Sequence, residues 1–487
     1  MSERLTFVLN GERVDLQDFS PTETLLSFLR NQRALTGSKE GCAEGDCGAC
    51  TVIIGELENG QISYRSVNAC IAFLPMLHGR LVITIEGVAG PQGQLHPVQQ
   101  AIIDHHGSQC GFCTPGFVMS LYALHLGGEQ ADRAAINNAF SGNLCRCTGY
   151  GPLISAAEQA LVQETPDWEA ARQRKNSQLL DGLVPDKAVS FSSHGGRWDM
   201  PVELEELARL CEQAPRATLV AGASDIGLWV TKQMKSLPHL IDVTRVSELR
   251  KIEVEETLIR IGAAVRYSEA HEIIAEHFPD FGELMRRIGG GQVRNTGTLG
   301  ANIANGSPIG DTPPVLIALA AMLVLRCGSK TRTIALEDYF IAYGQQDRSS
   351  GEFIEAIEIP RLENPEQLKC YKLSKRFDQD ISSLCGCFNI KIEQGVVVEA
   401  RIAYGGMAGI PARARQVETA LIGKPWNRAT IATAQAAYGD DFAPLDDVRG
   451  ASEYRLLAAR NLLLKLYMES DTPLSQTRLV GRGSTFA

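Results

Sequence analysis

The sequence lacks any excess of basic residues. Its 487 residues include 47 Lys and Arg against 57 Asp and Glu, a formal net charge of −10. A protein that binds a polyphosphate backbone needs a positive surface field, because neutralised phosphates supply most of the affinity. The charge balance therefore argues against nucleic acid as a partner.

Long apolar runs are also missing. The first residues, MSERLTFVLNGERVDL, carry two charges and then alternate, without the continuous apolar core of a secretory signal. No window approaches the ~18 uninterrupted apolar residues of a membrane-spanning helix, because the apolar segment 313–325 is short and is followed by Arg326. These features predict a cytoplasmic protein that does not bind a membrane.

Two common nucleotide-binding signatures are absent. No G-x-G-x-x-G follows a predicted strand, and no G-x-x-x-x-G-K-[ST] occurs. The sequence therefore offers neither a Rossmann site nor a P-loop site.

What the sequence does contain is an uneven supply of cysteine. Eight of its 13 cysteines precede residue 150. In a reducing compartment, clustered thiols are more often metal ligands or catalysts than disulfides. Cys42, Cys47 and Cys50 form C-x4-C-x2-C, and Cys70 follows after nineteen further residues. This is the plant-type [2Fe-2S] ligand spacing.

The loop that carries three of these cysteines must curl tightly around two irons. Gly41, Gly45 and Gly48 are expected to supply positive φ angles and to leave backbone N–H groups directed at the sulfurs. Structural zinc is the alternative for four cysteines, but zinc sites prefer paired C-x2-C motifs and this group has only one.

The residues around this loop predict a small mixed domain. Alternating residues flank Asn10-Gly11 as in a β-hairpin, and a helix is expected to begin at Pro21. Further strands are expected directly after Cys50 and from Leu81. The combination resembles the β-grasp ferredoxin fold.

The second cysteine group has a different spacing. Cys110 and Cys113 form C-x2-C, and Cys145 and Cys147 form C-x-C after 31 intervening residues. Helical patterns surround both pairs, with a helix expected to be capped at Thr114. A second cluster on a four-helix domain is therefore expected.

Histidine ligands are an alternative for this second group. A Rieske cluster replaces two cysteines with two histidines, and His96, His105 and His106 lie close by in the sequence. Four cysteines are already present, so these histidines are expected at the surface or at an interface.

Three segments together carry a family resemblance. CAEGDCGACTV, QCGFCTPGF and LCRCTGYGP, in this order, resemble the molybdenum hydroxylases, the family that contains xanthine dehydrogenase, aldehyde oxidase and bacterial carbon monoxide dehydrogenases. The resemblance implies that the first four cysteines ligate the cluster nearer a flavin and the second four the cluster nearer the molybdenum cofactor. Gln109 and Cys147 match positions that approach the pterin.

Two glycine-bearing loops follow, at 219–227 and 289–311. Consecutive backbone N–H groups in such loops bind phosphate without lysine, although either loop alone is also compatible with simple tight turns. The loops resemble the FAD domain of this family, which has the vanillyl-alcohol oxidase fold. The resemblance implies FAD contacts from Leu219, Val220, Ala221, Gly222, Ala223, Ser224, Asp225, Ile226, Thr298, Leu299, Gly300, Ala301, Asn302, Asp311, Ile354 and Lys372.

Two positions depart from the animal members of the family. Ile288 stands where they carry an aromatic residue, so an apolar contact with the flavin nucleotide replaces stacking. Gln379 and Asp380 stand where they carry two adjacent acids beside the flavin ring. This difference leaves the flavin's balance between NAD and oxygen open.

The fold class implied is a multidomain α+β chain. We expect a ferredoxin-like domain at 1–90, a helical [2Fe-2S] domain at 91–165, a linker at 166–190, an FAD domain at 191–364, a flavoprotein C-terminal domain at 365–475 and a tail at 476–487. The remaining cysteines, Cys211, Cys327, Cys370, Cys385 and Cys387, are expected to pack in the core.

The module order looks most like the small subunits of the xanthine dehydrogenase type. This resemblance implies a large partner subunit that binds molybdopterin and hydroxylates hypoxanthine and xanthine. It also implies that electrons pass through both clusters and FAD to NAD. The expected assembly is a pair of heterodimers. No catalytic residue for the purine chemistry is expected on this chain. The alternatives are a subunit acting on aldehydes or N-heterocycles, a stand-alone NADH-linked electron-transfer flavoprotein, and a non-catalytic interaction protein.

Overall fold

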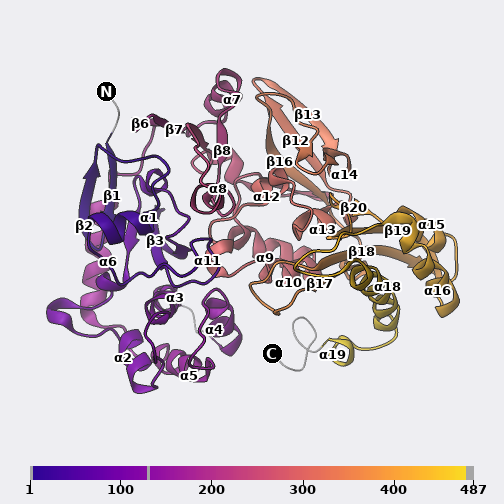
Figure 1. The fold of residues 1–487 in the computed structure, drawn as a ribbon, viewed down its shortest axis with the longest axis horizontal. Helices are drawn as coiled ribbons and strands as arrows, with labels where there is room; N and C mark the ends of the chain where they lie inside the picture. Colours follow the sequence, from indigo (N-terminus) through magenta and orange to yellow (C-terminus); the bar gives the residue numbers. More distant parts are fainter. Residues whose placement is uncertain (1–3, 129–131, 479–487) are drawn as a thin grey trace. The chain divides into compact units, whose positions relative to one another are not determined.

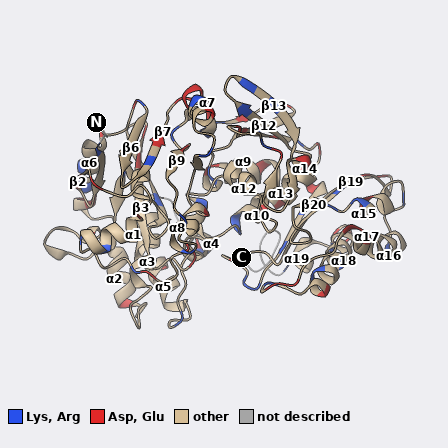
Figure 2. Cartoon of the chain, turned by 45° about the horizontal axis from the view of Figure 1, so that its top comes forward, with Lys and Arg blue, Asp and Glu red and all other residues tan. Residues whose placement is uncertain are grey.

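The computed structural model describes residues 4–128 and 132–478 of the chain (Figure 1). The described residues form two compact units. The first contains those up to 207 together with 216–246 and 289–297, and the second contains 208–215, 247–288 and those from 298 onward. Among the described residues, no helix is long and apolar enough to cross a bilayer. Lys and Arg are scattered among Asp and Glu over many elements (Figure 2).

The first unit begins with a five-stranded sheet of order β2-β1-β5-β3-β4. Its strands are β1 Leu5–Leu9, β2 Glu12–Leu16, β3 Thr51–Glu58, β4 Gln61–Asn68 and β5 Leu81–Ile83. The predicted hairpin is confirmed, because Asn10 (φ 50°) and Gly11 (φ 80°) both adopt the positive φ of a tight turn between β1 and β2. The strand expected from Leu81 ends at Ile83.

The helix expected from Pro21 is shorter and less regular than the sequence predicts. Thr24 accepts a hydrogen bond from the Ser27 N–H and caps α1, Leu25–Ser27. The chain then continues as a π-helical turn, η1 Phe28–Gln32, which buries Phe28 and Leu29 against the sheet.

Four helices follow, as predicted, and share one apolar core with the ferredoxin-like sheet, which contributes Ile53 and Leu81. They are α2 Pro97–Asp104, α3 Thr114–Leu126, α4 Arg133–Phe140 and α5 Gly151–Ala160. The polar stretch expected as a linker forms a further helix, α6 Asp167–Leu180, which buries Glu169, Asn176 and Leu180.

A second sheet completes the first unit. Its order is β6-β7-β9-β8, with β6 Val189–Ser193, β7 Gly196–Met200, β8 Thr218–Val220 and β9 His239–Asp242. The ring centroids of Phe73 and of Trp198 in β7 lie 6.1 Å apart in an edge-to-face arrangement. This sheet therefore shares a core with the ferredoxin-like sheet. The short helices α8 Ile226–Thr231 and α11 Gly291–Arg294 also belong to this unit.

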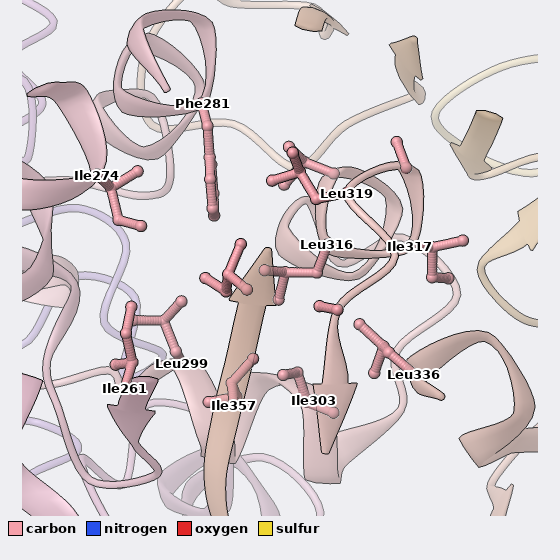
Figure 3. Close-up of a cluster of buried hydrophobic side chains, with 14 of the residues drawn as sticks. Ile261, Ile274, Phe281, Leu299, Ile303, Leu316, Ile317, Leu319, Leu336 and Ile357 are labelled. Atoms are coloured by element: carbon pink, nitrogen blue, oxygen red, sulfur yellow. The ribbon is translucent and has the colours of Figure 1, made fainter. Parts of the chain in front are cut away.

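The second unit contains an antiparallel sheet of order β10-β11-β16-β12-β13. Its strands are β10 Ile252–Val254, β11 Leu258–Gly262, β12 Met322–Cys327, β13 Lys330–Ala335 and β16 Phe353–Pro360. Phe281, Leu316 and Ile357 point into one apolar cluster between this sheet and its helices (Figure 3). The helices are α9 Tyr267–His277, α10 Pro279–Arg286, α12 Leu299–Asn305, α13 Thr312–Ala318 and α14 Leu336–Tyr339, followed by the hairpin β14 Phe340–Ala342 and β15 Gln345–Gln346.

The last part of the second unit is a four-stranded antiparallel sheet with helices on it. The strands run in the order β17 Leu368–Leu373, β18 Leu384–Glu393, β19 Val396–Gly405 and β20 Ala412–Arg413. The helices are α15 Arg415–Leu421, α16 Arg428–Ala436, α17 Tyr438–Asp441, α18 Ser452–Glu469 and α19 Leu474–Thr477. Helix α7, Leu204–Gln213, completes the main elements.

The late cysteines follow the predicted pattern only in part. Cys385 and Cys387 are buried in β18, and Cys211 is buried as well. Cys327 and Cys370 are only half-buried, because each lies on a sheet edge or at a strand end.

Candidate metal and cofactor sites

The first cysteine group converges at the end of a strand pair. Strands β3 and β4 pair Thr51 with Asn68, which brings Cys50 and Cys70 to the same end of the sheet. The Cys42 thiol hydrogen-bonds those of Cys47 and Cys70, and Cys70 also hydrogen-bonds Cys50. The four sulfurs are therefore adjacent, as the spacing predicts.

Backbone N–H groups point at this cluster of sulfurs. The Cys47 and Asp46 N–H groups donate to Cys42 Sγ, at 3.3 and 3.4 Å between nitrogen and sulfur. The pKa of the Cys42 thiol is lowered, first by hydrogen bonds from the Cys47 and Cys70 thiols. The same hydrogen bonds raise the pKa values of the Cys47 and Cys70 thiols. The backbone N–H donors remain available when all of these thiols are deprotonated, as metal ligation requires.

The loop glycines act in two different ways. Gly48 has φ +70°, as predicted for a tightly curled loop. Gly41 does not adopt a positive φ, so that part of the prediction is wrong. A Cβ at Gly41 would instead lie 2.8 Å from Cys47 Sγ, so its missing side chain makes room for a ligand sulfur.

The second cysteine group lies in two loops of the helical domain. Cys113 hydrogen-bonds Cys145, and Cys110 hydrogen-bonds Cys147. Burial raises the pKa of the Cys113 thiol to about 12, while Cys110 and Cys147 are exposed. The Gln109 side chain donates to the Cys147 carbonyl at 3.1 Å. The group therefore has one covered pair and one pair at the surface.

Thr114 does not cap helix α3 with its side chain. Cys113 is the residue that precedes the helix, and its side chain makes no capping hydrogen bond. Thr114 Oγ1 donates instead to Ser108 Oγ at 2.8 Å, which ties the loop that carries Cys110 to the helix start.

The donor set fits two [2Fe-2S] clusters. Each group supplies four cysteine sulfurs, the number that a [2Fe-2S] cluster takes. Within the described ranges, no group of three or more Cys, His, Asp or Glu side chains is arranged to hold a single metal ion. A [2Fe-2S] cluster differs from such a site, because its four cysteines are shared between two irons.

The histidines near the second group behave differently from one another. His106 is exposed and His105 half-buried. His96 is fully buried inside this chain, so its predicted position at the surface or at an interface is wrong. Its Nδ1 accepts from the Val98 N–H at the start of α2, and burial lowers its pKa to about 3. His96 is therefore a neutral helix cap.

The predicted segment 219–226 comprises the end of β8, a turn at 221–225 and the first residue of α8, all in the first unit. Ala223 adopts a positive φ of 55°, which turns the backbone sharply. A Cβ on Gly222 would lie 1.8 Å from the carbonyl oxygen of Thr296. The two predicted flavin loops therefore touch at Gly222 within this unit.

The later predicted residues gather in the second unit. Thr298 Oγ1 accepts from the Ala301 N–H at the start of α12, and Asn302 Oδ1 accepts from Thr312 Oγ1. A Cβ on Gly300 would lie 2.5 Å from Ala263 Cβ, so this position has room only for glycine.

Asp311 and Lys372 form a buried ion pair. Lys372 Nζ donates to Asp311 Oδ2 at 2.6 Å, and both residues are less than 10% exposed. Ser382 Oγ donates to the other carboxylate oxygen at 2.5 Å. The sequence did not single out Ser382, and its only signal was its place at the end of KRFDQDIS.

The remaining predicted contacts are less available to a ligand. Ile354 is 6% exposed in β16 and belongs to the apolar cluster, and Ile288 is half-buried against that cluster. Gln379 is buried with φ 54°, and Asp380 accepts from the Arg376 N–H at 3.0 Å. Gln379 and Asp380 therefore help to fix the backbone conformation of their own loop.

Four family models match successive parts of the chain. A 2Fe-2S iron-sulfur cluster binding domain matches residues 7–74, a [2Fe-2S] binding domain 84–158, an FAD binding domain in molybdopterin dehydrogenase 190–362, and a CO dehydrogenase flavoprotein C-terminal domain 369–470. The chain belongs to the molybdenum hydroxylases. It corresponds to the iron-sulfur and FAD portion of the xanthine dehydrogenase-like members.

Relatives from animals and plants resemble nearly the whole chain. The xanthine dehydrogenase of Drosophila subobscura is 31% identical over 98% of this chain, and xanthine dehydrogenase 2 of Arabidopsis thaliana is 32% identical over 94%. The chain spans about 40% of the length of these relatives, 40% and 39% respectively.

Solved structures resemble about half of the chain. A carbon monoxide dehydrogenase from Hydrogenophaga pseudoflava is 27% identical with a TM-score of 0.52, covering 55% of this chain and 93% of that one. Quinoline 2-oxidoreductase from Pseudomonas putida 86 is 22% identical with a TM-score of 0.52, covering 55% and 94%, and shows a shared fold.

These matches confirm the α+β fold class and the broad cofactor expectation. Two [2Fe-2S] domains and an FAD domain make this chain an iron-sulfur flavoprotein, and they favour iron-sulfur clusters over zinc. The individual ligand and FAD contacts remain predictions.

Proposed function

We propose that this chain is the electron-transfer subunit of a xanthine dehydrogenase and passes electrons from a molybdenum subunit to NAD. One observation carries the proposal: the similarity to xanthine dehydrogenases runs through all four matched modules and covers up to 98% of the chain. The carbon monoxide dehydrogenase chain described above resembles about 55% of this chain, and 93% of that chain is matched.

Each cysteine group would hold one cluster. Cys42, Cys47, Cys50 and Cys70 would hold the one nearer FAD, and burial of Cys50 and Cys70 keeps water from their sulfurs. Cys110, Cys113, Cys145 and Cys147 would hold the other. Exposed Cys147, with Gln109 bonded to its carbonyl, would face the pterin of a large molybdopterin-binding subunit.

The FAD contacts are assigned in the same way. Residues 219–226 would hold the pyrophosphate with their backbone N–H groups. Thr298, Leu299, Gly300, Ala301, Asn302, Asp311, Ile288, Ile354 and Lys372 would supply the remaining contacts. When bound, the clusters exchange electrons singly and FAD exchanges them singly or in pairs, while the protein contributes position and electrostatics. The buried Lys372–Asp311 pair offers a fixed dipole of this kind.

The proposal predicts the response of the native, partner-bound protein to xanthine. In an anaerobic visible spectrum, xanthine is expected to bleach the flavin and iron-sulfur bands, and NAD is expected to restore them. Hypoxanthine should act in the same way, because both purines would be oxidised on the partner. The assembly is expected to be a pair of heterodimers.

The same spectroscopic measurement distinguishes the alternative functions. If an aldehyde or an N-heterocycle bleaches the bands while xanthine does not, in a sample shown to contain molybdenum, the purine assignment fails and another molybdenum hydroxylase is indicated. If NADH bleaches them and a native pulldown recovers no large partner, the chain is a stand-alone flavoprotein.

A further inference from the structure

Nine residues of the FAD module belong structurally to the iron-sulfur unit. Residues 289–297 fall in the first unit, although the chain on both sides of them belongs to the second. The Arg294 side chain donates to Asn138 Oδ1 on α4 at 2.7 Å, and Asn295 donates to the Ser66 carbonyl on β4 at 3.0 Å. We call residues 289–297 the strap.

Gln292 is the most deeply buried side chain of the strap, at 1% exposure. Its Nε2 lies 3.1 Å from Thr51 Oγ1, 3.2 Å from Ser120 Oγ and 3.2 Å from Asn143 Oδ1. Each of these partners belongs to a cysteine-bearing segment. Thr51 follows Cys50 directly, Ser120 lies on the helix that begins after Cys113, and Asn143 lies two residues before Cys145.

The partners of Gln292 are bonded in turn to the first cysteine loop. Asn143 Nδ2 donates to the Gly48 carbonyl at 3.1 Å, and Thr51 Oγ1 donates to the same carbonyl at 2.6 Å. The Leu144 N–H donates to the Cys47 carbonyl at 3.0 Å. One buried amide therefore bonds both the residue that follows Cys50 and a residue two positions before Cys145.

The atoms around this hydrogen-bond network are closely packed. A Cβ on Gly116, in the first turn of α3, would lie 2.2 Å from the Gly48 carbonyl oxygen. A Cβ on Gly142 would lie 1.8 Å from Gln292 Oε1. The two cysteine loops thus meet backbone to backbone, and the Gln292 side chain fills the remaining space.

The buried amide oxygen of Gln292 lowers the stability of the fold. Gln292 Oε1 is buried and makes no hydrogen bond, and an unsatisfied buried acceptor opposes folding. An apolar side chain of the same length would avoid that cost. Such a side chain would lack the N–H donors that bond Thr51, Ser120 and Asn143 in the cysteine-bearing segments.

We propose that Gln292 is a positioning residue that fixes the two cluster loops relative to each other. All the bonds of Gln292 that support this role lie within the first unit. This inference rests on the proposed function in so far as the two cysteine groups hold redox clusters. It assigns Gln292 no contact with substrate or cofactor.

The test uses Gln292→Met in the full, partner-bound protein. Met keeps the length of the side chain and removes the N–H donors. After reduction with dithionite, we expect iron and FAD contents equal to those of the unsubstituted protein. We expect the electron paramagnetic resonance signals of both clusters to shift, together with the splitting caused by their magnetic interaction, which depends on their separation.

Asn295→Asp is the matched control. It changes a donor on the same strap that bonds the Ser66 carbonyl and neither cysteine loop. Its resonance spectrum is expected to match that of the unsubstituted protein. A Gln292→Met spectrum with unchanged signals and unchanged splitting would overturn the proposal, even if the thermal midpoint fell, because a purely structural role predicts that result.

A second variant decides the question if Gln292→Met does not fold. Ser120→Ala removes one acceptor of the Gln292 amide and leaves the strap intact. A smaller shift of the same signals supports the proposal, and an unchanged spectrum overturns it. Dithionite reduction needs no purine, so a failure with xanthine as substrate leaves this result standing.

Discussion

Replacing Gly222 with alanine is expected to yield a protein that retains its iron and loses most of its FAD. The added Cβ would lie 1.8 Å from the Thr296 carbonyl oxygen and 2.2 Å from its carbon, and both are backbone atoms. Forcing atoms into a packed site costs about 1–3 kcal/mol. If the loop at 219–226 moves to relieve the contact, that cost corresponds to a roughly 10–100-fold weaker affinity for FAD.

The measurement is the ratio of flavin to iron in the purified protein, followed by titration with added FAD. Gly291→Ala is the matched control, because a Cβ there meets nothing within 4 Å and the residue has no positive φ. A normal flavin content in the Gly222→Ala protein would show that the loop at 219–226 does not hold FAD.

Arg478→Ala is expected to destabilise the second unit strongly. The Arg478 side chain, 9% exposed, lies 2.8 Å from Asp280 and 3.1 Å from Glu469, whose side chains are 0% and 1% exposed. Removing one partner from a buried ion pair costs about 3–5 kcal/mol, because the remaining charge stays buried. For a unit of this size the thermal midpoint is expected to fall by roughly 10 °C.

The effect of this substitution should depend on pH. Burial acts to raise the pKa of Glu469, but hydrogen bonds and charge attraction from Arg478 outweigh it, and the pKa is lowered from 4.5. A lowered pKa adds stability that is complete above the unfolded value and is lost as the pH falls through the folded value. The difference from the unsubstituted protein should therefore be full above pH 4.5 and shrink below it.

Calorimetry at neutral and acid pH measures both effects. Lys391→Ala provides the control, since its pair with Glu393 is largely exposed and a solvent-screened surface pair contributes little to stability. Equal midpoints for Arg478→Ala and Lys391→Ala would contradict the assigned role of the buried cluster.

Local signals in the sequence predicted local structure well. The Asn10-Gly11 turn follows from two residues whose preferred φ is positive, and the cysteine spacing reflects how far one loop reaches around two irons. Both properties depend on residues that are close together in the chain, so no tertiary information was needed.

The errors share one physical cause, which is contact between distant residues. His96 is buried because Tyr122, His125 and Trp168 pack around its ring. Ser382 reaches Asp311 across 71 residues. Gln292 lies in a glycine-bearing stretch that suggested phosphate binding, and no spacing rule connects it to Thr51, Ser120 or Asn143.

The strap also determines when the iron-sulfur part of the chain becomes complete during synthesis. Thr51, Ser120 and Asn143 leave the ribosome long before Gln292, and until residue 292 emerges their buried acceptors lack the amide that bonds all three. N-terminal domains normally fold as soon as they are made. Here a fragment cut at the end of the helical domain would have a gap lined by polar groups where Gln292 belongs, so the boundaries of the sequence modules are not the boundaries at which this protein can be divided.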